Sequence, residues 1–297
     1  DDMSENYMPQ RSSFPIWGNR FTTEWIKKYN PDSTFTYDLA AINSDLPEYS
    51  IFKKYDTSVE KSSIFRQMGG NHVEVVLNGK ENTIKLSVPF ETFGNKTAFH
   101  ILKNTLYHSP TFIDHASVEK KECKPLYSQP TDSVLKKMMY RSDNFIAEQI
   151  LLMAADQALN ELNEKKLIDT LLKNELKDLP QKPRWVDGSG LSRYNLFTPN
   201  DEVYMLDRMI SEFGTTRMEK IFPTGGYGTL KNMFNKESGK IFAKTGSMGN
   251  VYCLSGWYYN KKNQPILFTV MINNHVGDFS ILKKTVADWI CDIMKKN

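Results

Sequence analysis

The 297-residue sequence lacks several features that would narrow its function at once. Its three cysteines lie far apart and outside any Cys-x-x-Cys cluster, so we expect neither a disulfide framework nor a cysteine-based metal site. Its five histidines show no spacing of the His-x-x-x-His kind, and we predict no metal and no cofactor. Because no run of about eighteen apolar residues occurs, we also predict no transmembrane segment.

The sequence also has no excess of one charge. It carries 38 basic and 35 acidic residues, which alternate in short mixed runs and leave a net charge of +3. We therefore expect a solvated surface and no nucleic-acid partner. The chain opens in acidic, loop-like sequence without a signal-peptide pattern, and we expect that something upstream has been removed.

Up to about residue 88 the pattern favours β-structure. Two segments alternate in period two around Asn78-Gly79, which is a strong signal for a β-hairpin. From about Asn95 the hydrophobic period becomes helical. We predict a boundary near residues 89–95, with a β-rich region in residues 1–90 and a second domain in residues 91–297.

The second domain is predicted to mix helices with an antiparallel hairpin. Helical periodicity on either side of residues 141–144 predicts two helices with a polar joint, in which Ser142 is expected to act as the cap. Strands on either side of residues 260–263 predict a hairpin, and residues 282–293 predict a closing amphipathic helix. This order indicates an α+β domain without βαβ repeats.

The stretch Lys244-Thr-Gly-Ser247 interrupts one of these predicted strands. A lysine at a strand end is most often a solvated charge, so the stretch alone is weak evidence. However, Gly246 leaves the strand edge open to an extended ligand. Lys244 and Thr245 offer a cation and a hydroxyl to a carboxylate, and the backbone N–H of Ser247 can point at an oxyanion.

The polar joint Ser142-Asp-Asn144 is by itself explained as a helix cap. Together with Lys-Thr-Gly, however, it forms two of the three motifs of serine acyl-transfer enzymes, which combine Ser-x-x-Lys, Ser-Asp-Asn and Lys-Thr-Gly. The two motifs occur in the expected order. We therefore take Ser142, Asn144 and Lys244 as candidate catalytic residues and Thr245, Gly246 and Ser247 as candidate substrate-binding residues.

The surroundings of both motifs resemble one family, the low-molecular-mass class C penicillin-binding proteins. These are the D-alanyl-D-alanine carboxypeptidase/endopeptidases of peptidase family S13. The similar segments are residues 142–149, 185–199, 223–232 and 243–247, and residues 7–19 resemble the family's inserted β-rich region. The run Asp187-Gly-Ser-Gly-Leu-Ser-Arg193 is the most specific of them.

The resemblance implies a penicillin-binding-protein/β-lactamase-like transpeptidase domain, preceded by a β-rich inserted region. In such an enzyme Ser142 relays a proton to the leaving amine, and Asn144 hydrogen-bonds the bound peptide or the acylating lysine. Lys244 and Thr245 hold the terminal carboxylate, and Ser247 contributes an oxyanion-hole donor. The implied partners are peptidoglycan peptides and, as inhibitors, β-lactams, and this substrate implies an extracytoplasmic (periplasmic) location.

Three further residues are expected at the border of the site: Asp143, Asp187 and Ser189. For Asp187 and Ser189 the favoured interpretation is a structural one, because the glycines at positions 188 and 190 indicate a tight turn.

The sequence departs from the family at the nucleophile. The pattern Ser-x-x-Lys occurs at Ser50, Ser58, Ser117, Ser133 and Ser280. So short a pattern recurs by chance, and the family places its nucleophile before the inserted region. We therefore expect the nucleophilic serine and its lysine to lie outside these 297 residues.

Two alternatives remain. A class A β-lactamase shares the three motifs but should carry a Glu-x-x-Leu-Asn segment, whereas residues 156–160 read Asp-Gln-Ala-Leu-Asn. A non-catalytic peptidoglycan-binding fragment or pseudoenzyme is the alternative from another functional class, and the absent nucleophile motif motivates it.

Overall fold

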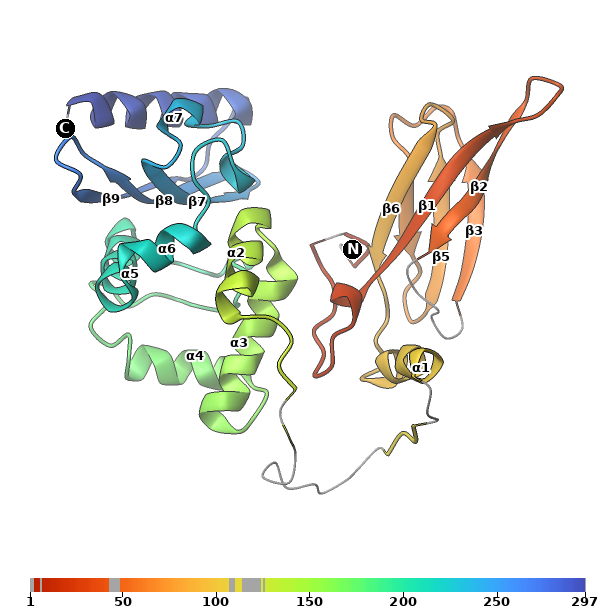
Figure 1. Ribbon diagram of the computed structural model, residues 1–297, viewed down its shortest axis with the longest axis horizontal. Helices are drawn as coiled ribbons and strands as arrows, with labels where there is room; N and C mark the ends of the chain where they lie inside the picture. Colours follow the sequence, from red (N-terminus) through yellow and green to blue (C-terminus); the bar gives the residue numbers. More distant parts are fainter. Residues whose placement is uncertain are drawn as a thin grey trace. The chain divides into compact units, whose positions relative to one another are not determined.

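The computed structural model describes residues 3–5, 7–42, 49–106, 110–113, 124 and 126–296. By its internal contacts the chain divides into two compact units, residues 1–125 and residues 126–297 (Figure 1).

The first unit consists of two three-stranded sheets and one helix. One sheet has the order β2-β1-β6 and is antiparallel; the other has the order β3-β5-β4, in which β3 runs parallel to β5 and β4 antiparallel to it. The elements are a 3₁₀ turn at Trp17–Asn19, β1 (Arg20–Tyr29), β2 (Phe35–Ile42), β3 (Tyr49–Tyr55), β4 (Ser63–Arg66), β5 (Asn71–Leu77), β6 (Thr83–Pro89) and α1 (Lys96–Thr105).

The two sheets enclose a single core. Alternate residues of β1, Phe21 and Trp25 among them, are buried together with Val73 and Val75 of β5. This alternation is what a strand with one face in a core requires.

The predicted hairpin around Asn78-Gly79 is wrong, although strands do flank it. β5 pairs with β3 and β4, and β6 pairs with β1, so the chain crosses from one sheet to the other here. The buried Asn78 side chain stabilises the crossing, because its amide nitrogen donates to the Glu60 carbonyl at 2.9 Å and its amide oxygen accepts from Ser62 Oγ at 3.1 Å. The pairing of β5 and β6 with other strands therefore outweighs the local hairpin signal of Asn78-Gly79.

The division between the units also differs from the predicted boundary near residues 89–95. Helix α1 belongs to the first unit, because Ile101 is part of the core between the two sheets. The helical period that begins near Asn95 therefore marks a helix of the first unit, and the two units separate after residue 125.

The second unit has the predicted α+β architecture. Its antiparallel sheet has the order β7-β8-β9. Its elements are α2 (Thr131–Arg141), α3 (Asn144–Leu159), α4 (Glu164–Lys173), α5 (Pro199–Phe213), α6 (Thr215–Ile221), 3₁₀ turns at Gly228–Leu230 and Asn235–Glu237, β7 (Ile241–Met248), β8 (Val251–Tyr259), β9 (Pro265–Ile272) and α7 (Phe279–Lys296).

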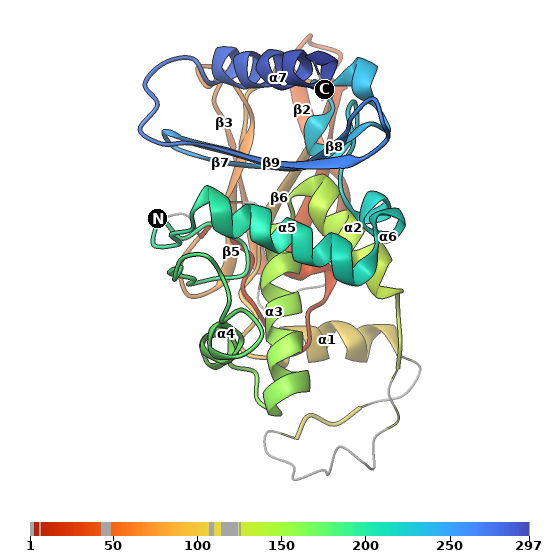
Figure 2. The ribbon, with the colours of Figure 1, turned by 90° about the vertical axis from the view of Figure 1, so that its left-hand side faces the viewer.

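Helices cover both faces of this sheet (Figure 2). On one face, Val286 and Ile290 of α7 pack on Ile241 and Leu254. On the other face, Leu206 of α5 joins a cluster that holds the stacked rings of Phe242 and Trp257, whose centroids are 5.3 Å apart. Because side chains alternate along a strand, Lys244 leaves β7 on the same face as Phe242. The lysine of the Lys-Thr-Gly motif therefore points toward the helices that carry the other motif.

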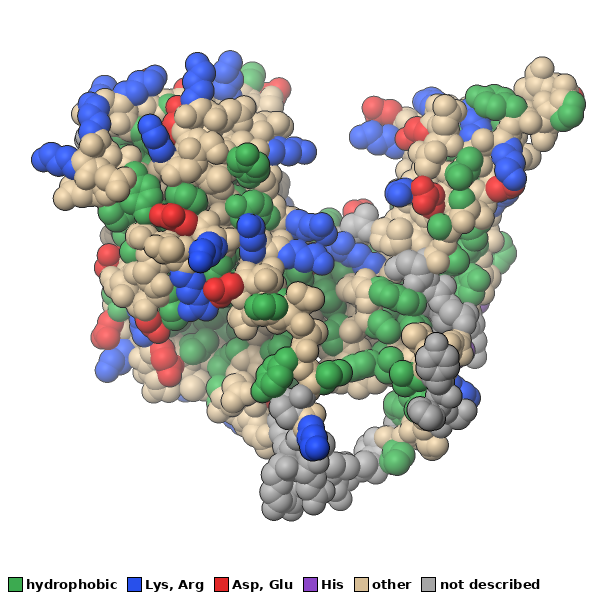
Figure 3. Space-filling view, in the orientation of Figure 1, with side chains coloured by type: hydrophobic (Ala, Val, Ile, Leu, Met, Phe, Trp, Pro, Cys, Tyr) green, Lys and Arg blue, Asp and Glu red, His purple; other side chains and the backbone are tan. Residues whose placement is uncertain are grey.

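Helix α2 is fixed to α6 by an ion pair. The Arg217 guanidinium donates to both carboxylate oxygens of Asp132, with its closest contact, Nη2 to Oδ1, at 2.8 Å. The pair lowers the pKa of Asp132. Figure 3 shows Asp and Glu side chains among the Lys and Arg side chains on the visible face of this unit.

The close approach of β8 to β7 at Gly256 can be tested by substitution. A Cβ at Gly256 would lie 2.1 Å from the Phe242 carbonyl oxygen and 2.6 Å from the Ala243 Cα, both of which are backbone atoms. We expect Gly256→Ala to lower the free energy of unfolding by about 1–3 kcal/mol through overpacking. The control is Gly246→Ala, because the nearest atom to a Cβ there is Cys253 Cβ at 3.6 Å. Equal thermal unfolding temperatures for the two variants would contradict this reading.

Candidate active site

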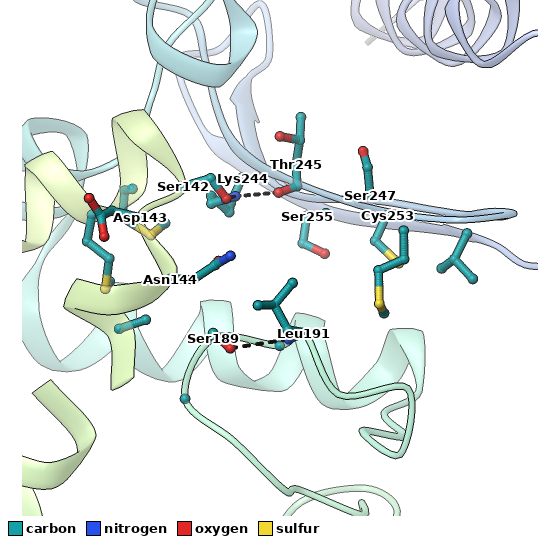
Figure 4. Close-up of a pocket in the computed structure, with 18 of the residues that line it drawn as sticks. Ser142, Asp143, Asn144, Ser189, Leu191, Lys244, Thr245, Ser247, Cys253 and Ser255 are labelled. Carbon is teal, nitrogen blue, oxygen red and sulfur yellow. Dashed lines mark hydrogen bonds between the residues drawn. The ribbon is translucent and has the colours of Figure 1, made fainter. Parts of the chain in front are cut away.

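A cavity of about 430 Å³ brings the two sequence motifs of the second unit together. It lies between the α2–α3 joint, the loop at residues 188–191, the start of α5, and strands β7 and β8 (Figure 4). Its lining includes all six candidate catalytic and substrate-binding residues: Ser142, Asn144, Lys244, Thr245, Gly246 and Ser247.

The α2–α3 joint is built differently from the prediction. Ser142 does not cap α3; it ends α2 in the left-handed conformation, with φ 52°. The cap is Asp143, whose carboxylate accepts a hydrogen bond from the Ile146 backbone nitrogen at 3.1 Å. Because Asp143 caps the helix, the Ser142 hydroxyl remains available to face β7. Asp143 itself lines the cavity.

Lys244 and Ser142 are in direct contact. The Lys244 Nζ donates a hydrogen bond to Ser142 Oγ at 2.8 Å and also contacts the Thr245 carbonyl oxygen. Among the described residues, no carboxylate forms an ion pair with this half-buried lysine. Burial alone lowers the pKa of Lys244 to about 8. At pH 7 the group is therefore mostly a cation without a counter-charge, which favours an anionic ligand in the cavity.

Strand β7 presents two kinds of position to a ligand. Lys244 and Gly246 lie on the face shared with Ser255 and Cys253, their partners in β8. Thr245 and Ser247 project to the other side of the strand, as alternation requires (Figure 4). Gly246 and Ser247 are exposed, so the strand is accessible at this point.

Asn144 is the first residue of α3, and its amide points into the cavity between Ser142 and Leu191 (Figure 4). An amide in this position offers one acceptor and two donors to a ligand. The structure thus places all three residues of the Ser-Asp-Asn motif along the cavity, with Asp143 committed to the helix cap.

The glycine-rich loop after Asp187 forms the opposite wall. The Asp187 carboxylate accepts hydrogen bonds from the backbone nitrogens of Gly190 and Ser192, at 2.6 and 2.7 Å, and from Asn195 Nδ2 at 3.0 Å. Asp187 does not line the cavity, whereas Ser189 does. The Ser189 Oγ accepts from the Leu191 nitrogen at 3.3 Å (Figure 4). The carboxylate of Asp187 therefore shapes the loop, which agrees with the tight turn expected there.

Helix α3 holds this loop in place. The Glu148 carboxylate accepts from the backbone nitrogens of Gly188, at 3.3 Å, and Ser189, at 3.0 Å. Gly188 packs so closely that a Cβ would lie 2.9 Å from the Ala147 carbonyl oxygen. The helix that begins with the Ser-Asp-Asn motif therefore also fixes the opposite wall of the cavity.

Sequence reasoning missed one acidic residue of the cavity, Glu202 of α5. Burial, and next the charge of Asp201, raises the pKa of Glu202. No motif marks this position, which follows the helix start at Thr198-Pro199 like any other residue of a first turn. Only the packing of α5 beneath the sheet brings it to the site.

The Ser-x-x-Lys serines do not reach this cavity. Ser50 and Ser58 belong to the first unit, Ser133 lies in α2 and Ser280 in α7; Ser117 is outside the described residues. None of the four described serines lines the cavity.

The structure does not support the β-lactamase alternative either. Its nearest sequence match, residues 156–160, forms the end of α3, where Asn160 is the C-cap. None of these five residues lines the cavity.

Across the described parts of the chain, no group of three or more His, Cys, Asp or Glu residues could hold a metal ion. In the same parts, no helix is both long and apolar enough to cross a membrane.

Comparison with known proteins decides the family. Residues 1–290 match the D-Ala-D-Ala carboxypeptidase 3 (S13) family. The chain belongs to this family. The S13 resemblance seen in the sequence is therefore confirmed.

Two curated relatives match part of the S13 chain. The D-alanyl-D-alanine carboxypeptidase DacB of Haemophilus influenzae is 31% identical over 162 residues, which are 51% of this chain and 33% of the relative. A penicillin-sensitive carboxypeptidase A of Dictyostelium discoideum is 33% identical over 99 residues, which are 30% of this chain and 19% of the relative. The matches thus span a third or less of either relative.

Solved structures confirm the fold. Penicillin binding protein 4 (dacB) of H. influenzae matches with a TM-score of 0.69 and 21% identity, over 94% of this chain and 65% of that chain. A predatory endopeptidase of Bdellovibrio bacteriovorus matches with a TM-score of 0.52 and 14% identity, over 94% of this chain and 80% of that chain. All of these relatives are named as penicillin-binding proteins, carboxypeptidases or endopeptidases. The comparisons give no support to a non-catalytic fragment or pseudoenzyme.

The anchoring of the loop by Glu148 can be tested directly. We expect Glu148→Ala to lower the free energy of unfolding by about 1–3 kcal/mol, because it removes the acceptor of two backbone N–H groups. Glu148→Gln should cost less, since its amide oxygen can still accept one of them. Asp169→Ala, at an exposed position of α4, is the control. Denaturant titration that finds Glu148→Ala as stable as the control would refute the anchoring role.

Proposed function

We propose that this S13 chain forms the carboxylate-binding and proton-relay part of a serine-type D-Ala-D-Ala carboxypeptidase/endopeptidase. The substrates are peptidoglycan stem peptides, which are cleaved through an acyl-enzyme. The observation that carries the proposal is the 2.8 Å hydrogen bond from Lys244 Nζ to Ser142 Oγ. It joins the Lys-Thr-Gly and Ser-Asp-Asn motifs, which are distant in sequence, in one cavity.

Binding begins with the terminal carboxylate of the substrate. Lys244 supplies a cation whose burial strengthens its pull on an anion. Thr245, the next residue, projects from the other side of the strand and adds a hydroxyl donor. Gly246 leaves the strand edge open, so the peptide can lie along β7 through main-chain hydrogen bonds. The Ser247 N–H then points at the carbonyl oxygen that becomes negative during attack.

Proton transfer to the leaving group falls to Ser142. Its oxygen already accepts from Lys244, so its own proton is free to be donated to the departing amine. The neighbouring cation favours the transient negative charge on Ser142 that this relay requires. Asn144 hydrogen-bonds the peptide or the acylating lysine from the start of α3.

The nucleophilic serine and its lysine are supplied by a part of the gene product outside residues 1–297. Two findings support this: no described serine of a Ser-x-x-Lys pattern lines the cavity, and the curated relatives are much longer than their matches. β-Lactams would act as inhibitors by acylating that serine. The H. influenzae penicillin binding protein 4, which has this fold, was crystallised with a β-lactam. The substrate places the enzyme in the extracytoplasmic space, the periplasm.

The proposal predicts release of D-alanine from a peptide that ends in D-alanyl-D-alanine. We expect the full-length gene product to catalyse it, and Ser142→Ala to reduce the rate by about 10²–10⁴-fold through loss of the proton relay. Ser133→Ala is the control, because Ser133 lies in α2 outside the cavity. Loss of activity in the control alone would reject the assignment of Ser142.

The lowered pKa of Lys244 predicts that substrate binding depends on pH. The carboxylate requires the cationic form, so affinity for the free-acid peptide should fall as the pH rises through about 8. We expect Lys244→Gln to weaken this binding by about 10–100-fold, the equivalent of one charge-assisted hydrogen bond. The same peptide with a C-terminal amide is the control in calorimetry. If Lys244→Gln weakens the binding of both peptides equally, Lys244 does not bind the carboxylate.

A further inference from the structure

The two sheets of the first unit differ on their outer faces. On the sheet β2-β1-β6, polar side chains pair with each other across the strands: Lys85 Nζ and Glu24 Oε1 are 3.3 Å apart, and Thr22 Oγ1 donates to Ser87 Oγ at 3.1 Å. Cross-strand ion pairs and hydroxyl pairs are typical of a sheet face that meets water. The outer face of the sheet β3-β5-β4 is built from different residues.

A row of three residues crosses this second outer face. Phe52 of β3 and Phe65 of β4 both pair with Glu74 of the central strand β5, and residues that pair directly lie on the same face of a sheet. Val73 and Val75, on either side of Glu74, belong to the core, so the row points away from the core. The side chains of Phe52 and Phe65 are 58% and 50% exposed. The unit therefore presents two phenyl rings with a carboxylate between them.

The polar groups of this face are available to a ligand. Glu74 is half-buried, and its carboxylate forms no hydrogen bond or ion pair with any described residue. Beside it on the same face, Ser50 Oγ and His72 Nδ1 are hydrogen-bonded at 2.7 Å. The row thus combines two apolar plates with an acceptor that lacks a donor.

This combination excludes several kinds of partner. A lipid surface or a dry apolar protein surface would bury the Glu74 charge without compensation. A cationic peptide would meet the charge of Lys54, which lies on the same face two residues after Phe52. A sugar chain fits both features, because the C–H faces of its rings are apolar while its hydroxyl and acetamido N–H groups are donors.

The spacing of the two rings also favours a sugar chain. Neighbouring strands lie about 4.8 Å apart, so Phe52 and Phe65 are separated by about 9.5 Å, with Glu74 halfway between them. This separation is close to the length of one disaccharide repeat in a β-1,4-linked glycan. Phe52 and Phe65 can therefore stack on two sugars of one chain while the intervening sugar lies over Glu74.

We propose that the outer face of the sheet β3-β5-β4 binds a β-1,4-linked glycan of N-acetylated sugars. Phe52 and Phe65 stack on two sugar rings, and Glu74 accepts hydrogen bonds from the sugar between them. The natural ligand is the glycan strand that carries the stem peptides, an assignment that rests on the proposed function. Binding through the first unit holds the enzyme on the polymer and raises the concentration of stem peptides available to the second unit.

The test uses the 297-residue chain, with a soluble hexamer of β-1,4-linked N-acetylglucosamine as the probe in titration calorimetry. We expect Phe52→Ala and Phe65→Ala each to weaken binding by about ten-fold, because each removes one aromatic contact. Phe52→Tyr keeps the ring and should bind like the wild type. Phe52→Leu keeps the apolar character but not the ring, and should bind like Phe52→Ala. Glu74→Gln should weaken binding by about 3–10-fold, since the acceptor loses its charge.

The matched control is Ile26→Ala, because Ile26 lies on the outer face of the other sheet and is 42% exposed. This variant should bind the hexamer like the wild type. Failure of the folded wild type to bind the hexamer overturns the inference, and so does equal affinity of Phe52→Leu and the wild type. Binding of oligolysine or of phosphatidylglycerol vesicles in place of the hexamer overturns it as well.

The full-length gene product supplies a kinetic readout. With polymeric peptidoglycan as substrate, the double variant Phe52→Ala/Phe65→Ala should raise KM by about ten-fold or more and leave kcat unchanged. With a free stem peptide, both constants should equal those of the wild type. An equal rise in KM for both substrates would show a structural effect and contradict the inference.

The two proposals fail separately, because the hexamer titration involves no catalysis. A full-length product that releases no D-alanine contradicts the proposed function, whereas glycan binding is still decided by the hexamer. A wild-type chain that does not bind the hexamer contradicts the inference and leaves the proposed function intact.

Discussion

The hydrogen bond between Lys244 and Ser142 is the contact on which the site depends. It requires β7 to present Lys244 on the helix side of the sheet, and it requires the α2–α3 joint to leave the Ser142 hydroxyl uncapped. Asp143 meets the second requirement by capping α3 in place of Ser142. Within this short motif, Asp143 therefore caps the helix, while Ser142 and Asn144 present their side chains to the cavity.

Carboxylates hold the rest of the site around this contact. Asp187 folds the glycine-rich loop, and Glu148 ties that loop to α3, so that the helix carrying Ser142 also positions Ser189. Both carboxylates accept hydrogen bonds from backbone N–H groups.

Local patterns in the sequence predicted much of the second unit. The polar joint, the closing hairpin and the final helix follow from periodicity and capping, and the paired motifs predicted that Ser142, Asn144 and Lys244 share a cavity. What failed depended on distant contacts. Asn78-Gly79 is a hairpin signal overridden by strand pairing elsewhere, α1 joins the first unit through Ile101, and Glu202 reaches the cavity only because α5 packs beneath the sheet.

The central claim is that this cavity is completed by a serine from outside residues 1–297. The most direct measurement is mass-spectrometric mapping of the residue acylated by a penicillin in the full-length gene product. The account predicts a single modified serine, followed three positions later by lysine, upstream of Asp1. Modification of a serine within the chain, such as Ser133 or Ser142, would contradict it.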